Sequence, residues 1–169
     1  VLGTFEDVFI DILRMRTLYS NVPKPCTILP VDFLPEEVKL LAVSLEKQNL
    51  MYTIQPVESS METYTALDTL NRKSWCTILL AFFPANTELI TTIVPSKIRN
   101  INGVFIVKER LEITLLLNQS WKFPILVIEP MKNLENVAIH VKIPECIQLQ
   151  NYDFWKQNIG FFKSKKILN

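Results

Sequence analysis

Four acidic residues each stand just beyond an apolar run of the sequence. They are Asp32, Glu58, Glu109 and Glu129. In α/β proteins, catalytic and ligand-binding residues commonly follow the strands in this way. If the runs are parallel strands, these acids lie along one edge of the sheet, and converging carboxylates can hold Mg²⁺ for phosphodiester cleavage. Acids in such positions also cap helices and solvate strand ends. We expect that structural role, and therefore predict no catalytic site, no metal and no cofactor.

Residues for nucleophilic or zinc chemistry are few. His140 is the only histidine and alternates with apolar neighbours, so we expect an ordinary surface position on one face of an edge strand rather than a place in a catalytic triad. The cysteines, Cys26, Cys76 and Cys146, are odd in number and lack zinc-like spacing. Because Cys26 and Cys76 lie in apolar runs, we expect free buried thiols and a reducing compartment.

Basic residues flank one of the apolar runs. Lys97 and Arg99 precede the run that begins at Gly103, and Lys108 and Arg110 follow it. Side chains of this kind contact the phosphates of DNA when they share one surface. These four residues are our candidate DNA-binding set, although scattered basic residues are often only a solvated face.

The totals exclude several classes of function. A chain of 169 residues with 49% hydrophobic residues can form one domain with a sizeable core. Only three glycines are present, too few for a phosphate-binding loop of the P-loop or Rossmann type. The net charge of +1 gives no overall attraction to nucleic acid. No apolar run is long enough to suggest a membrane span.

The pattern along the chain predicts an amphipathic N-terminal helix over residues 1–22 and a single α/β domain over residues 23–169. Continuous apolar runs are typical of strands buried on both faces. They begin at Cys26, Leu50, Trp75, Gly103 and Pro124. Helical patterns separate them, at 35–45, 60–70, 86–94 and 109–118, with an edge strand at 137–141 and a closing helix at 152–163. We predict a central, mostly parallel or mixed five-stranded sheet with helices on both faces.

Residues 71–83 (NRKSWCTILLAFF) and 98–109 (IRNINGVFIVKE) resemble the central sheet of XPF-type nuclease domains, and residues 26–57 and 123–129 fit the same layout. The resemblance is closest to the nuclease-dead branch, which includes the meiotic "shortage in chiasmata" proteins. It implies a catalytically inactive module in the nucleus that acts in meiosis, DNA recombination and DNA repair. Such a module would bind a protein partner, such as a related XPF-like subunit, and branched or single-stranded DNA.

The sequence departs from the active members of that family. They carry a Gly-Asp pair and a Glu-Arg-Lys stretch, whereas here Glu109-Arg110 is followed by Leu111 and no Gly-Asp pair occurs. The resemblance therefore implies that Asp32 and Glu109 are remnants of a degenerate metal site.

A second resemblance is to Toll/interleukin-receptor (TIR) domains. Ile128-Glu-Pro130 and Phe154-Trp155 are similar to the end of that fold, although residues 57–60 (VESS) replace its usual loop after the second strand. It implies a cytoplasmic signalling adaptor that associates with similar domains. The arrangement of the strands distinguishes the TIR-like from the XPF-like alternative. A TIR-like sheet is five-stranded and parallel, while an XPF-like sheet contains antiparallel strands. The alternation of strands and helices favours the parallel version. A third alternative is a metal-dependent enzyme that uses Asp32, Glu109 and Glu129.

Overall fold

The computed structural model describes residues 9–14, 26–55, 77–84, 88–98, 101–130, 137–142 and 144. Its elements are β1 (Thr27–Val31), α2 (Pro35–Lys47), β2 (Thr53–Ile54), β3 (Thr77–Phe82), η1 (Leu89–Ile93), α4 (Val94–Lys97), β4 (Ile101–Ile106), α5 (Arg110–Leu117), β5 (Ile125–Pro130) and β6 (Val137–Lys142). Residues 9–14 are also helical. The helices predicted at 60–70 and 152–163 lie outside the described residues.

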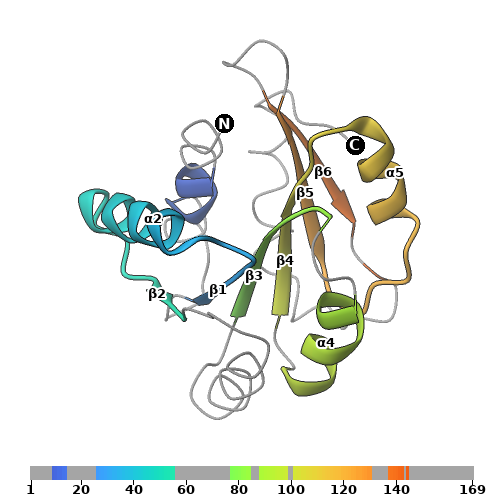
Figure 1. Ribbon diagram of the computed structural model, residues 1–169, viewed down its shortest axis with the longest axis horizontal. Coiled ribbons are helices and arrows are strands. Elements are labelled where there is room, and N and C mark those ends of the chain that lie inside the picture. The colour runs from blue at the N-terminus through green and yellow to red at the C-terminus, as the bar shows by residue number, and fades with distance from the viewer. Residues whose placement is uncertain are drawn as a thin grey trace.

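The strands form one sheet in the order β2-β1-β3-β4-β5-β6. β1 to β5 are parallel to one another, and β6 pairs with β5 in the antiparallel direction at the edge of the sheet. The α/β prediction is confirmed, with the predicted edge strand near residue 137 as a sixth strand of the sheet. β2 is shorter than its apolar run indicated. Helices lie on both sides of the sheet (Figure 1).

The central strands are buried on both faces, which explains why their sequences are continuous apolar runs. In β3, Ile78 and Leu80 point to one core while Leu79 and Ala81 point to the other. Side chains alternate in the same way along β1, β4 and β5. We call the two sides the α2 face and the α5 face, after the helix that covers each.

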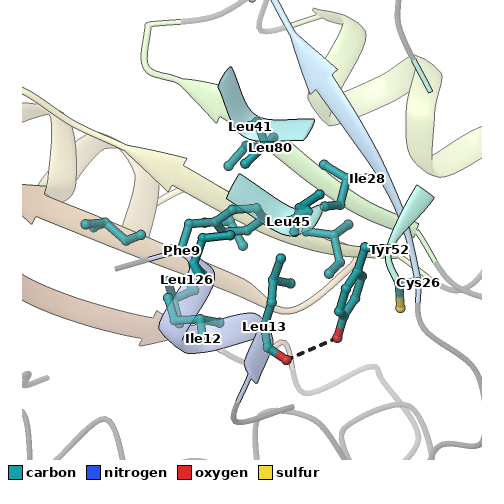
Figure 2. Packing of buried hydrophobic residues seen from close by; sticks show 14 of the residues in the cluster. Phe9, Ile12, Leu13, Cys26, Ile28, Leu41, Leu45, Tyr52, Leu80 and Leu126 are labelled. Carbon is teal, nitrogen blue, oxygen red and sulfur yellow. Dashed lines mark hydrogen bonds between the residues drawn. The ribbon is translucent and has the colours of Figure 1, made fainter. Parts of the chain in front are cut away.

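The α2 face is closed by α2 and by helical residues 9–14 (Figure 2). Leu41 and Leu45 enter the core from α2, and Phe9 enters it from the helical segment. The Tyr52 hydroxyl donates a hydrogen bond to the Leu13 carbonyl at 3.3 Å. Residues 9–14 therefore share a core with the strands, whereas the domain boundary predicted at residues 22 and 23 lies outside the described residues.

The α5 face is closed by α5 and by the helical stretch made of η1 and α4. Ile113 and Leu116 enter this core from α5, and Ile90 and Val94 enter it from η1 and α4. Within η1 the helix is wide, because the Val94 N–H donates to the Leu89 carbonyl five residues back. Pro95 follows at once and has no N–H to donate, which fits a local change of helical pitch at this point.

Cys26 corrects one expectation. It is buried on the α2 face, as its apolar run predicted, but it is disulfide-bonded. The prediction of a free thiol at this position was wrong. A cysteine in an apolar run is consistent with either state, and composition alone does not distinguish them.

The described residues also bear on membranes. None of the helices in these ranges combines the length and the apolar character that a bilayer span requires.

Gly103 lies in the middle of β4, where two aromatic rings approach the backbone. A Cβ atom at this position would lie 2.8 Å from Cε2 of Phe123 and 2.9 Å from Cε2 of Phe105. Neither ring has room to withdraw, because each packs against Trp121 with centroids 5.4 Å and 5.2 Å apart. Only a residue without a side chain fits between β4 and this aromatic cluster.

We predict that Gly103→Ala lowers the free energy of unfolding by about 1–3 kcal/mol, the usual range for overpacking a dense core. Urea denaturation measures it. The same substitution in a Phe123→Leu background should cost less, because one of the two ring edges has been removed. A loss below about 0.5 kcal/mol, within the range of ordinary surface substitutions, would contradict the close approach.

Candidate functional site

The carboxyl ends of the parallel strands meet at one edge of the sheet, which we call the carboxyl edge. Val31 ends β1, Phe82 ends β3, Ile106 ends β4 and Pro130 ends β5. In open α/β sheets, ligands and partners commonly bind outside this edge, at the point where the strand order reverses. With the order β2-β1-β3, that point lies between β1 and β3. α2, which follows β1, and α5, which follows β4, also begin at this edge.

Asp32 lies at the carboxyl edge, directly after β1. It is exposed, and its backbone has φ 58°, in the left-handed region. Asp is among the few residues other than glycine that adopt this conformation readily. Asp32 therefore has a local structural role, which is to turn the chain from β1 toward α2.

Glu109 is the N-cap residue of α5. Three residues later, the Glu112 carboxylate accepts hydrogen bonds from the backbone N–H groups of Lys108, at 2.7 Å, and Glu109, at 3.0 Å. α2 begins in the same way, because the Glu37 carboxylate accepts from the N–H of Leu34 at 3.1 Å. Acids in these positions satisfy free donors and favour the positive end of the helix dipole.

The far end of α5 is fixed as well. The Trp121 indole N–H donates to the Leu116 carbonyl at 2.5 Å. The Lys142 ammonium, from β6, donates to the Leu117 carbonyl and, at 3.2 Å, to that of Gln119. A cation at the last carbonyls of a helix is favourable. α5 is thus anchored at both ends, and the backbone of its first turn, with Arg110 and Leu111, is held in place.

Glu129 is paired with the single histidine. The Glu129 carboxylate lies 3.3 Å from Nε2 of His140, and the two side chains are 18% and 8% exposed. His140 is the register partner of Val127 on the neighbouring strand, so the two polar side chains share the α5 face. The histidine was predicted on an edge strand and lies on one. We expected a surface position, but it is buried.

The three candidate metal ligands do not gather at one point. Asp32 turns the chain after β1, Glu109 begins α5 after β4, and Glu129 pairs with His140. β1 and β4 are separated by β3, so their ends stand about 10 Å apart, at two strand spacings. Among the described residues, no group of three or more His, Cys, Asp or Glu side chains is placed to hold a metal ion. Glu58 lies outside the described residues.

The predicted DNA-binding residues that the structure describes fall at opposite edges of the sheet. Lys108 and Arg110 are exposed at the carboxyl edge, on either side of Glu109. Lys97 is the last residue of α4, just before β4 begins, and so its backbone lies at the amino edge; α4 is seen near the start of β4 in Figure 1. The side chain of Lys97 and the whole of Arg99 are outside the described residues. The six residues of β4 span about 20 Å. The structure brings two of the four residues together.

An aromatic pair lies at the point of strand reversal. The rings of Phe33, after β1, and Phe82, at the end of β3, stack with centroids 5.0 Å apart and planes 29° apart. Each is only partly buried. Sequence reasoning missed this pair, because only the pairing of β1 with β3 brings the two rings together.

Exposed leucines stand at the starts of the two helices that begin at this edge. Leu34 is 60% exposed at the start of α2, and Leu111 is 68% exposed in the first turn of α5. Isolated exposed leucines are common, but a patch of apolar side chains at one edge is often an interaction site. We define the carboxyl-edge surface by the residues that follow β1, β3 and β4 at this edge: Asp32, Phe33, Leu34, Glu36, Phe82, Lys108, Glu109, Arg110 and Leu111.

The charges on this surface are divided. At the β1 side, Asp32 and Glu36 are exposed and acidic, and we call them the acidic end. At the β4 side, Lys108 and Arg110 form the basic end, although Glu109 is exposed between them. Leu34 stands at the β1 side with the acidic end, and Leu111 stands at the β4 side with the basic end. Phe82 ends β3, the strand between these two sides. The edge therefore carries exposed apolar side chains together with charges of both signs, a combination that protein interfaces also show.

We predict that Glu112→Ala destabilises the protein by about 1 kcal/mol, because two backbone N–H groups at the start of α5 lose their acceptor. Glu112→Gln should cost less, since it keeps an acceptor oxygen. The exposed Glu46 of α2, replaced by alanine, is the control, with an expected change within about 0.5 kcal/mol. Equal unfolding midpoints in urea for Glu112→Ala and Glu46→Ala would contradict the capping role.

Comparison with known proteins gave no relative for this chain. No protein-family model matches it, and neither the curated proteins nor the solved structures gave a match.

Proposed function

We propose that this domain is a non-catalytic association module, and that its carboxyl-edge surface pairs with a second copy of the chain. The observation that carries the proposal is the exposure of Leu34 and Leu111, at the starts of α2 and α5, at the edge that also carries the half-buried Phe33–Phe82 pair. A symmetric contact would remove these apolar side chains from water, and burial of apolar area stabilises association by about 25 cal/mol per Å² before its costs.

Charge supports a second copy as the occupant. Most homodimers have two-fold symmetry. If one residue of the first copy contacts a second residue of the other copy, the same contact then occurs with the two copies exchanged. If two carboxyl-edge surfaces meet about a two-fold axis, the acidic end of each copy faces the basic end of the other. The Asp32 and Glu36 carboxylates would then lie opposite Lys108 and Arg110. Such complementarity orients partners and disfavours wrong ones.

The strand arrangement gives more support to the TIR-like alternative than to the XPF-like one. Five neighbouring strands are parallel, and the antiparallel strand β6 stands at the edge rather than within the sheet. Association with similar domains is also what the TIR resemblance implies. A nuclear role in meiosis, recombination or repair depends on the XPF resemblance alone, and is the less supported reading.

Structural roles for the candidate acids support the absence of catalysis. Asp32 turns the chain, Glu109 begins α5, and Glu129 is paired with His140. The metal-dependent enzyme alternative would need at least two of these carboxylates on one metal ion, which would take them away from those roles.

We predict that the protein self-associates in sedimentation velocity, with an average mass that rises with concentration. Lys108→Glu with Arg110→Glu should weaken dimerisation at least about tenfold through like-charge repulsion. Asp32→Asn with Glu36→Lys should do the same, and asparagine is chosen at position 32 because it also tolerates positive φ.

The two charge variants provide the decisive comparison. Each should dimerise poorly alone, whereas an equimolar mixture should form a heterodimer, since mixing restores opposite charges across the contact. Val43→Asp is the matched control, because Val43 is exposed on α2 but does not belong to the carboxyl-edge surface. A wild-type protein that stays monomeric at high micromolar concentration would refute the proposal, as would a Val43 variant that dissociates equally.

Binding of single-stranded or branched DNA is a second candidate function. It is favoured by the exposure of Lys108 and Arg110 next to the strand that ends in Phe82, because cations and aromatic rings together bind unpaired bases and phosphates. Since the stacked pair offers only its outer ring faces, this candidate has less support than association.

For the DNA candidate we predict salt-dependent binding in a gel shift with branched and single-stranded DNA at two salt concentrations. Lys108→Ala with Arg110→Ala should weaken binding and lower the slope of log K against log salt by about 1.5, two phosphate contacts at about 0.7–0.9 each. Lys97→Ala with Arg99→Ala tests the other two candidate residues in parallel. Binding that responds neither to salt nor to either double variant would eliminate this candidate.

A further inference from the structure

We propose that Glu109 limits the strength of the association from within the contact, because it places a negative charge inside the basic end of the carboxyl-edge surface. The inference rests on the proposed function, since it concerns the same surface and the same partner, a second copy of the chain. It makes Glu109 the residue that keeps the dimer weak enough to dissociate and that determines which charges the basic end accepts.

Three consecutive charged residues stand between β4 and the first turn of α5. Lys108, Glu109 and Arg110 are all exposed, so the basic end has two positive charges and one negative charge. Arg110 is the first residue of α5, and Glu109 is its N-cap residue. Because α5 is anchored at both ends, the backbone of these residues has a fixed place at the β4 side of the edge.

The hydrogen bonds at the start of α5 do not require the charge of Glu109. The Glu112 carboxylate accepts from the N–H groups of Lys108 and Glu109. The Glu112 N–H donates in turn to the backbone carbonyl of Glu109 at 3.1 Å. Glutamine at position 109 keeps the shape of the side chain and an acceptor oxygen. It loses only the modest attraction of a carboxylate to the helix dipole, which acts within one copy.

Two-fold symmetry determines what Glu109 faces. α2 and α5 cover opposite faces of the sheet, and β3 stands between β1 and β4. In the proposed dimer the two-fold axis runs along the strand direction at β3, so it exchanges the two faces as well as the two sides. The start of α2 in one copy is therefore brought opposite the start of α5 in the other.

The charges across this contact both attract and repel. Asp32 and Glu36 are exposed at the start of α2. They attract the two basic residues of the other copy and repel its Glu109. An exposed charge pair changes an association constant by up to about fivefold. Because symmetry repeats every contact, the repulsion occurs twice, and its effect on the homodimer is the square of the effect of one contact.

Glu109→Gln removes the repulsion. In sedimentation velocity we expect this variant to dimerise about three- to tenfold more tightly than the wild type at low salt, and the gain to shrink at about 0.5 M salt, where exposed charges are screened. Glu46→Gln is the matched control, because Glu46 is exposed on α2 but lies outside the carboxyl-edge surface. The control should leave the dimerisation constant unchanged. Equal constants for the wild type and Glu109→Gln would overturn the proposal.

The heterodimer of the two charge variants gives a sharper test, because it contains one contact of each kind. The first copy carries Asp32→Asn with Glu36→Lys, and the second carries Lys108→Glu with Arg110→Glu. Glu109 of the first copy faces native carboxylates, so Glu109→Gln placed there should tighten the heterodimer about twofold to threefold. Glu109 of the second copy faces the positive charge that Glu36→Lys introduces. The same substitution placed there should weaken the heterodimer by a similar factor.

The sign of the two effects decides the outcome. Opposite signs in the two copies support the proposal, because an effect on the folding of α5 would have the same sign in both. A change of the same sign in both copies, or no change in either, would refute the role of Glu109 and leave the proposed association in place. If neither the wild type nor Glu109→Gln dimerises at high micromolar concentration, the proposed function and this inference both fail.

Discussion

Burial of both faces of the central strands is the constraint on which the rest of the structure depends. β3, β4 and β5 can be removed from water only if helices cover each side, and the parallel order makes each connection between them cross a face of the sheet. It follows that the strands end at one edge and that α2 and α5 begin there. The position of every candidate residue at the carboxyl edge is a consequence of this arrangement.

The same constraint explains why acidic residues cluster near that edge without forming a catalytic site. A helix that begins directly after a strand leaves backbone N–H groups without acceptors. Glu37 and Glu112 supply those acceptors, while Asp32 adopts the backbone conformation that the turn after β1 needs. Acids beyond a strand are thus required by the local geometry. The leucines beside them, Leu34 and Leu111, are not required by it, which is why we assign the interaction surface to the apolar residues.

The sequence was sufficient to predict the sheet but not the surface. Continuous apolar runs such as that of β3 identify doubly buried strands, and the prolines and helical periodicity around α2 locate its start. The pairing of distant segments has no such local signal. Phe33 and Phe82 are separated by 49 positions and meet only through the register of β1 and β3. The state of Cys26 also has no local signal, because its apolar run was consistent with either a thiol or a disulfide.

Hydrogen–deuterium exchange at low and high protein concentration tests the central claim most directly, which is that the carboxyl edge is where this protein associates. We expect added protection at high concentration in peptides that cover residues 32–36 and 107–112, and none in the peptide around Val43. Protection that is independent of concentration, or that appears at the amino edge instead, would contradict the account.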